Sequence, residues 1–313
     1  MVGRAAEVKG PLILETTIPL PDVAGRLEHL AVDVTRKRLF VAETDGNAVD
    51  IIDLSTHQRL RRITGLAQPR GLAYLPDGDL LVVANGADGT VRFYRGADFS
   101  LRGNVPLGDD ANEVLVDPRN GHVLVGYDTS RIAVIDASTP KWLSDIPLPS
   151  RAEGLALSSA TGHLFVNVPM AGKIVMVDLS TMTGASWLTR GLEGNIPMTL
   201  DEESHSVIVV FRKPARLAIV DMTTGAMSLT ADTCGDAGGV ALDEKRSRLY
   251  VSCGAGSMDV IQRSAATLRR VARITTSGGA QASVFVPELD RLYLALPPTS
   301  KAEAAIRVYR ASQ

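Results

Sequence analysis

The feature that most constrains this chain is a repeat. The chain contains seven copies of a sequence motif in which two short apolar strands are joined by a polar turn, and the copies begin 41 to 44 residues apart. The first copy runs from His29 to Asp33 and from Arg38 to Ala42, and a third apolar strand follows. The other copies begin at Gly71, Glu113, Gly154, Pro197, Gly239 and Ser283. A more polar fourth strand ends the unit, and four short strands per ~40–50 residues is the period of a β-propeller blade. The repeat therefore predicts an all-β fold, a seven-bladed β-propeller with four antiparallel strands per blade.

The two ends of the chain predict how the ring closes. The seventh unit stops after its third strand, at Arg310, and lacks an outer strand. Residues 12–20 read as a strand whose ending resembles the fourth strands at Val105–Leu107 and Ile146–Leu148. We therefore expect residues 12–20 to join the C-terminal blade. This division predicts a flexible N-terminal segment at residues 1–10 and a single propeller domain at residues 11–313.

The repeats also resemble a known family. Besides the paired strands, the likeness is carried by Gly25–His29, Val83–Gly86, Leu107–Ala111 and Val284–Asp290. With these segments the chain resembles the YVTN/YncE-like family of bacterial seven-bladed propellers over nearly its whole length. The resemblance implies a periplasmic or secreted propeller, often of unassigned activity. One member of the family is associated with single-stranded DNA binding, and more distant relatives are lactonases and lyases.

The first ten residues depart from the family pattern. They are mostly polar and lack the apolar stretch of a secretion signal, so a cytoplasmic location stays open beside the periplasmic one. The chain also has no run of about 18 apolar residues, and no membrane span is predicted.

Composition disfavours nucleic acid as a partner. Lys and Arg number 33 against 35 acidic residues, the pI is near 6.2, and aromatic residues make up 4% of the chain. Proteins that bind single strands combine a basic groove with aromatic side chains on which bases stack. The basic runs Arg59–Arg62 and Arg269–Arg270 fall in predicted outer strands, where charge blocks edge-to-edge aggregation, so we expect them to be solvated.

The two cysteines, Cys234 and Cys253, form neither a disulfide framework nor a zinc pattern. Both are expected to approach the same face of the sixth blade. We expect a free, partly buried pair of thiols. A disulfide is the alternative in an oxidising compartment, although a sequence does not give the separation that the bond needs.

Blade geometry predicts where a ligand would bind. The first strand of each blade lines the axis, and the chain enters it from one face, which we call the top face. Polar residues therefore converge on the top mouth of the channel from seven directions. The candidate ligand-binding residues are Arg70, Asn112, Tyr127, Arg212 and Gln281. The alternative is a water-filled channel whose polar lining has no ligand.

His29 is the one histidine of five that is predicted to enter the channel, and the others fall in bottom-face turns. One imidazole cannot supply a multi-histidine iron or copper centre. Side-chain oxygens at the mouth instead predict a calcium-like divalent cation, held by Glu43, Asn85, Glu153, Asn195 and Asp236. Such a cation would polarise an ester, with His29 or Glu28 as the catalytic base. The alternative for His29 is a packing role between blades.

Three functions follow from these features. The first is a monomeric propeller that binds a small ligand or a protein partner at its top mouth. The second is a metal-dependent hydrolase of the lactonase, arylesterase or phosphotriesterase type. The third, single-stranded nucleic-acid binding, comes only from the family resemblance. Whether the protein is an enzyme stays open, because the chain carries no nucleophile-elbow, zinc-protease, phosphate-loop or dinucleotide motif.

Overall fold

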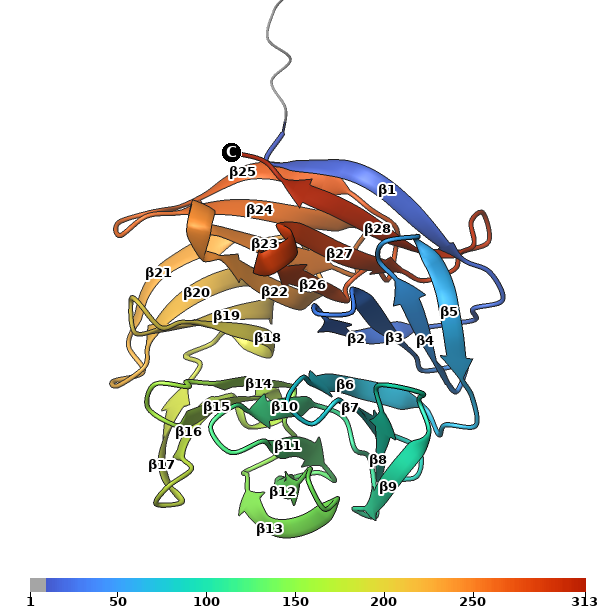
Figure 1. Ribbon diagram of the computed structural model, residues 1–313. Coiled ribbons are helices and arrows are strands. Elements are labelled where there is room, and N and C mark those ends of the chain that lie inside the picture. Colours follow the sequence, from blue (N-terminus) through green and yellow to red (C-terminus); the bar gives the residue numbers. More distant parts are fainter. Residues whose placement is uncertain (1–9) are drawn as a thin grey trace, which may run out of the picture.

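The computed structural model describes residues 10–313, and in this range the chain forms seven four-stranded antiparallel sheets. The sheets surround a common centre with the first strand of each sheet innermost (Figure 1). Three 3-10 turns, η1 (Pro169–Ala171), η2 (Glu244–Arg246) and η3 (Pro287–Leu289), are the helical elements of residues 10–313. The prediction of an all-β, seven-bladed propeller is confirmed. The predicted flexible segment, residues 1–10, lies outside the described residues except for Gly10.

The strands follow the predicted repeat from blade to blade. Blade one contains β2 (Leu27–Asp33), β3 (Arg38–Glu43), β4 (Ala48–Asp53) and β5 (Gln58–Ile63). Blade two contains β6 (Pro69–Leu75), β7 (Leu80–Asn85), β8 (Thr90–Arg95) and β9 (Leu101–Pro106). Blade three contains β10 (Val114–Asp117), β11 (His122–Tyr127), β12 (Arg131–Asp136) and β13 (Lys141–Pro147). Blade four contains β14 (Gly154–Leu157), β15 (His163–Val168), β16 (Lys173–Asp178) and β17 (Thr183–Leu188). Blade five contains β18 (Glu193–Asp201), β19 (Ser206–Lys213), β20 (Ala215–Asp221) and β21 (Met227–Asp232). Blade six contains β22 (Ala237–Asp243), β23 (Arg248–Cys253), β24 (Ser257–Arg263) and β25 (Leu268–Thr275). Blade seven contains β26 (Ser283–Val286), β27 (Arg291–Leu296), β28 (Ala304–Ala311) and β1 (Leu12–Leu20).

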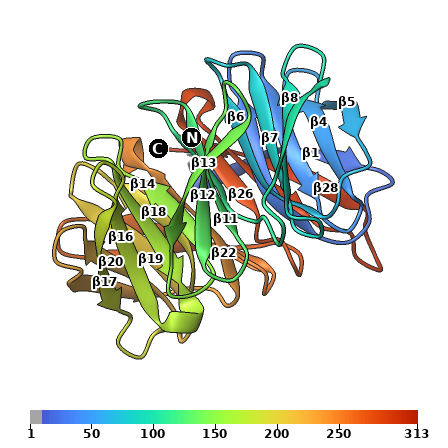
Figure 2. The ribbon, with the colours of Figure 1, turned by 90° about the horizontal axis from the view of Figure 1, so that it is seen from below.

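The ring closes as the sequence predicts. Strand β1 is the outer strand of blade seven and pairs antiparallel with β28, from Leu12 opposite Ala311 to Leu20 opposite Ala304. The two strands lie side by side although they come from opposite ends of the chain (Figure 1). Figure 2, turned by 90°, shows strands running between two opposite faces that carry the connecting loops.

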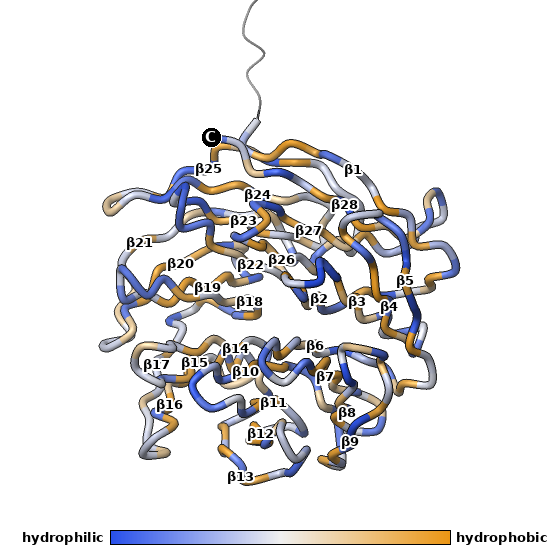
Figure 3. Tube along the Cα trace, viewed as in Figure 1, coloured by the Kyte–Doolittle hydropathy of each residue, from blue (hydrophilic) through white to orange (hydrophobic). Residues whose placement is uncertain are grey.

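The core lies between the blades, because the middle strands are apolar on both sides. All six residues of β3 are buried, and so are all six of β7. Alternate side chains of β3 face opposite neighbours: Val41 packs with Ile306 of blade seven, and Phe40 packs with Leu81 of blade two. Hydrophobic segments accordingly follow the middle of each blade, while hydrophilic ones lie in loops and in outer strands such as β5 (Figure 3). Burying one such side chain contributes about 1.5–3 kcal/mol.

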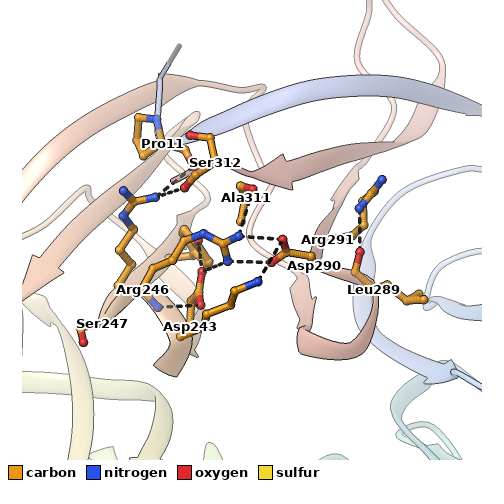
Figure 4. Close-up of polar contacts among 12 residues, drawn as sticks. Pro11, Asp243, Arg246, Ser247, Leu289, Asp290, Arg291, Ala311 and Ser312 are labelled. Atoms are coloured by element: carbon orange, nitrogen blue, oxygen red, sulfur yellow. Dashed lines mark hydrogen bonds and ion pairs between the residues drawn. The ribbon is translucent and has the colours of Figure 1, made fainter. Parts of the chain in front are cut away.

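An arginine network on the bottom face ties blade six to blade seven (Figure 4). Arg246 donates to the two carboxylate oxygens of Asp290 at 2.6 and 2.7 Å and to Asp243 at 3.0 Å. Arg248 donates to the carbonyl oxygen of Ser312 at 2.5 Å. Bidentate pairs of this kind fix geometry as well as adding energy. The C-terminal end of the closing blade is therefore held by its neighbour.

The expectation for the two cysteines is wrong. Cys234 and Cys253 form a disulfide with a Cα–Cα distance of 5.9 Å, and both residues are buried. Cys234 lies in the loop that leads into β22, and Cys253 ends the neighbouring strand β23, with Ala237 opposite it. Strand pairing therefore supplies the short separation that the sequence does not display. Along residues 10–313, no helix has the length and apolar character needed to cross a membrane.

Candidate functional site

A cavity of about 370 Å³ lies at the top mouth of the channel. Residues from the innermost segments of all seven blades line it, together with Arg212 of β19. Because every blade contributes, the cavity lies on the propeller axis. The predicted site residues that line it are Glu28, His29, Arg70, Asn112, Glu153, Arg212 and Gln281.

Glycines let the innermost strands approach each other beneath this cavity. A Cβ atom on Gly71 would overlap the carbonyl oxygen of Asn112, and one on Gly154 would overlap the carbonyl oxygen of Ile196. Both carbonyl groups belong to the next blade. The repeated glycine at the start of an innermost strand is therefore a packing requirement, and it brings the polar residues beside it close to the axis.

His29 and Glu113 form an ion pair that reaches from blade one to blade three. Nε2 of His29 lies 3.4 Å from Oε1 of Glu113, and the histidine side chain is 34% exposed. Removal from water lowers the pKa of His29. The negative charges of Glu113 and Glu28 outweigh this effect, and the pKa rises from 6.5 to about 9. His29 is therefore an imidazolium at neutral pH, which donates hydrogen bonds. A general base needs the neutral form, so this geometry favours a binding role for His29 over the predicted base.

A chain of alternating charges continues through blades two to four. Arg70 donates to Asp110 at 2.8 Å, and Arg151 pairs with the other oxygen of the same carboxylate. Arg151 also lies 2.9 Å from Glu153. Burial raises the pKa of Glu153, Arg151 opposes this effect, and the nearby Glu113 adds to it. Charged side chains of both signs thus line the cavity, and they are partly shielded from water.

Arg212 completes the polar wall from blade five. Its Nε donates to the carbonyl oxygen of Ala237 at 2.9 Å, and Nη2 donates to Gln281 at 3.3 Å. Its Nη1 lies 3.1 Å from Asp236. These contacts hold the guanidinium at the mouth. Arg212 lies near the end of β19, and its side chain is directed toward the channel.

The apolar residues of the wall come mostly from blades five to seven, and Leu30 of blade one and Leu155 of blade four add to them. Those from blades five to seven are Ile196, Pro197, Met198, Val240 and Ala282. The part of the wall formed by blades five to seven is therefore the richest in apolar residues, and we call it the apolar side, although Arg212 and Gln281 also belong to it.

Five predicted site residues do not line the cavity. Tyr127 donates its hydroxyl hydrogen to Asp145 of the outer strand β13 at 3.0 Å. Asn85 donates to Thr90, and Asn195 donates to Asn167. Glu43 pairs with Arg62, and Asp236 pairs with Arg212. Their partners lie in neighbouring strands or blades. The side chains of Glu43, Asn85 and Asn195 are buried. That of Asp236 is 54% exposed and lies beside the cavity rather than in its wall.

The five predicted cation ligands are thus separated, and four of them lie outside the cavity. Among residues 10–313, no group of three or more His, Cys, Asp or Glu side chains is arranged to hold a metal ion. Each of the five already has a protein partner. The calcium-like site stays a prediction without a preformed set of ligands.

Glu43 belongs instead to a buried pair of carboxyl groups in blade one. Glu43 and Asp50 are both fully buried. Burial raises the pKa of Glu43 to about 7, and the charge of Asp50 adds to this effect. Arg59 lies 2.8 Å from Asp50, and Arg62 contacts Glu43. These two arginines were expected to be solvated; they point inward because the buried acids need counter-charges.

The sequence interpretation missed two residues at the mouth, Asp110 and Arg151. Each precedes a predicted site residue by two positions: Asp110 before Asn112, and Arg151 before Glu153. That spacing was the available signal, because alternate residues of an extended segment share a side. Glu113 begins the third copy of the repeat, and no role in the site was predicted for it.

Comparison with known proteins gives the fold and no more. No protein-family model matches the chain, and no curated protein matches its sequence. Many solved structures are similar. One is a chain of the "Crystal Structure of Mitotic Checkpoint Complex", with a TM-score of 0.83 and 13% identity, covering 100% of this chain and 96% of that one. The protein is a seven-bladed β-propeller. At this identity the propeller shares an architecture with its neighbour, and function has to be argued from the cavity.

Proposed function

We propose that the propeller binds a small charged organic ligand in the cavity at its top mouth. The observation that carries the proposal is the convergence of Arg70, Arg151, Arg212 and the His29–Glu113 pair on one space of about 370 Å³. This volume falls within the usual range for small-molecule sites. Charged groups held in a partly desolvated space interact strongly with a complementary ligand.

A thermal-shift screen tests this function. The probes are succinate, putrescine, L-leucine and glucose, which represent a dianion, a dication, a zwitterion and a neutral polyol. A ligand at a hundred times its Kd stabilises the folded state by about 2.7 kcal/mol, a measurable shift. We expect at least one charged probe to raise the melting temperature and Arg70→Gln to reduce that rise. No shift with any probe, or a shift that Arg70→Gln leaves unchanged, would overturn the proposal.

We infer further that the protein belongs to the YVTN/YncE-like bacterial propellers, that residues 11–313 fold as one domain, and that the protein works in the periplasm or outside the cell. The repeated strand motifs support the family, and the disulfide between Cys234 and Cys253 supports an oxidising compartment. Fractionation of cells that express the full-length gene tests the location. Recovery only from the reducing cytoplasm would contradict it.

The hydrolase alternative depends on a bound cation. Elemental analysis of the purified protein, followed by an ester panel with and without chelator, tests it. Stoichiometric metal and chelator-sensitive turnover would support the hydrolase. The nucleic-acid alternative is tested by the mobility of a labelled oligonucleotide at low salt, where phosphate contacts are strongest.

A further inference from the structure

We propose that the ligand of the top-mouth cavity is a small zwitterion with an apolar side chain, of the chemical class of a free α-amino acid. This inference rests on the proposed function and names the kind of molecule that the same cavity takes. Three properties of its wall carry it: donors for a carboxylate, acceptors for an ammonium group, and an apolar side.

The donors for a carboxylate come from Arg70 and Arg212. A guanidinium has five N–H donors. Within residues 10–313, the Arg70 side chain donates a hydrogen bond to Asp110 through Nη1 alone. The Arg70 side chain keeps 21% of its surface exposed, and that of Arg212 keeps 31%. Both cationic groups therefore retain donor capacity at the wall of the cavity.

The acceptors for an ammonium group come from Glu113 and Glu153. Each uses its Oε1 atom for a cationic partner, His29 in one case and Arg151 in the other. The two glutamates are close enough for Glu113 to raise the pKa of Glu153. An ammonium group between them would relieve that repulsion. A ligand with only a negative charge would leave these carboxylates without the added counter-charge, and a ligand with only a positive charge would face the arginines.

The apolar side follows this acid-rich part around the ring. Ile196, Met198 and Val240 come from blades five and six, whereas Glu113 and Glu153 come from blades three and four. An apolar group on the ligand would remove this surface from water. The volume of about 370 Å³ suits a single amino acid or a very short peptide.

Isothermal titration with L-leucine and three matched compounds tests the inference. The compound 4-methylpentanoate lacks the ammonium group, 3-methylbutylamine lacks the carboxylate, and glycine lacks the apolar side chain. We expect L-leucine to bind at least about tenfold more tightly than each of the three, because each omission leaves one part of the wall unpaired. Equal or tighter binding by any of the three would overturn the inference.

Two variants locate the binding. Glu153→Gln and Arg70→Gln are each expected to weaken L-leucine at least about tenfold, because each removes one charge of the site. Arg216→Gln is the control, since it breaks only the exposed pair of Arg216 with Asp232. A circular-dichroism melt of each variant establishes that it is folded. Equal affinities for the control and Glu153→Gln would overturn the inference.

The outcomes separate this inference from the function on which it rests. If succinate or putrescine binds in an Arg70-dependent way and L-leucine does not, the ligand class is wrong and the binding function stands. If no charged probe binds, both proposals fail.

Discussion

Nε2 of His29 in blade one lies 3.4 Å from Oε1 of Glu113 in blade three, so an ion pair joins two blades that are not neighbours in the ring. The pair links residues 84 positions apart in a protein whose blades otherwise contact mainly their immediate neighbours. It also determines the charge of the one histidine that lines the channel mouth.

The first prediction concerns the titration of His29. The pKa of His29 is raised from 6.5 to about 9, so the pair stabilises the folded state fully below pH 6.5. This contribution is lost as the pH rises through 9. Glu113→Gln removes the main attractive charge and should lower the pKa of His29, measured by the NMR chemical shift of its imidazole. The exposed substitution Glu203→Gln is the control. An unchanged titration of His29 in Glu113→Gln would show that the pair does not form.

The second prediction concerns the buried acids of blade one. Because the pKa of Glu43 is raised from 4.5 to about 7, the folded state binds more protons than the unfolded state between these values. Stability should therefore fall as the pH rises through this window, by at most about 3 kcal/mol. Urea unfolding at several pH values measures the fall. Glu43→Gln should flatten it, whereas the exposed Glu288→Gln should not. If the free energy of unfolding falls equally with pH in both variants, groups other than Glu43 cause the fall.

The third prediction concerns closure of the ring. Ile18 of β1 is 1% exposed and pairs with Ile306 of β28. Ile18→Ala should lower the free energy of unfolding by about 2–5 kcal/mol, because it leaves a cavity in the seam of blade seven. Thr17→Ala, at an exposed position of the same strand, should change it by less than about 0.5 kcal/mol. Similar effects of the two substitutions, measured by denaturant unfolding, would mean that β1 does not close the ring.

The fourth prediction concerns the disulfide. Cys234 and Cys253 are separated by 19 residues. A bond closing a loop of this size stabilises a fold by about 3 kcal/mol through the unfolded state. The double substitution to serine should lower the unfolding midpoint to the value that the parent protein shows with reductant, and reductant should not affect the variant. Two thiols that react with a thiol reagent in the unfolded, unreduced protein would contradict the bond.

The sequence was sufficient for the fold because the repeat and its closure are both periodic signals. Residues 12–20 were predicted as the closing strand, and β1 has these bounds. The positions that begin each innermost strand were also predictable, since a propeller brings these positions to one axis. His29, Arg70 and Glu153 line the cavity for that reason.

The predicted positions at the ends of the second strands share this geometry only in part. Arg212 reaches the cavity, whereas Asn85 and Tyr127 do not. Tyr127 and Asn85 lie near the top face, but their side chains contact the third and fourth strands of their own blades. A strand alternates its side chains between two faces, so proximity to the axis does not make a residue face it. The disulfide and the inward arginines depend on distances between strands, which a sequence pattern does not contain.

The most direct test of the central claim uses the five histidines of the chain as reporters. His29 lines the mouth, whereas His57, His122, His163 and His205 lie in turns and strand starts of the opposite face. The measurement is the set of histidine side-chain NMR resonances during titration with L-leucine and, separately, with succinate. We predict that at least one of the two shifts the His29 resonance saturably while the other four stay in place. An unmoved His29, or an equal shift of a histidine on the opposite face, would contradict a ligand site at the top mouth.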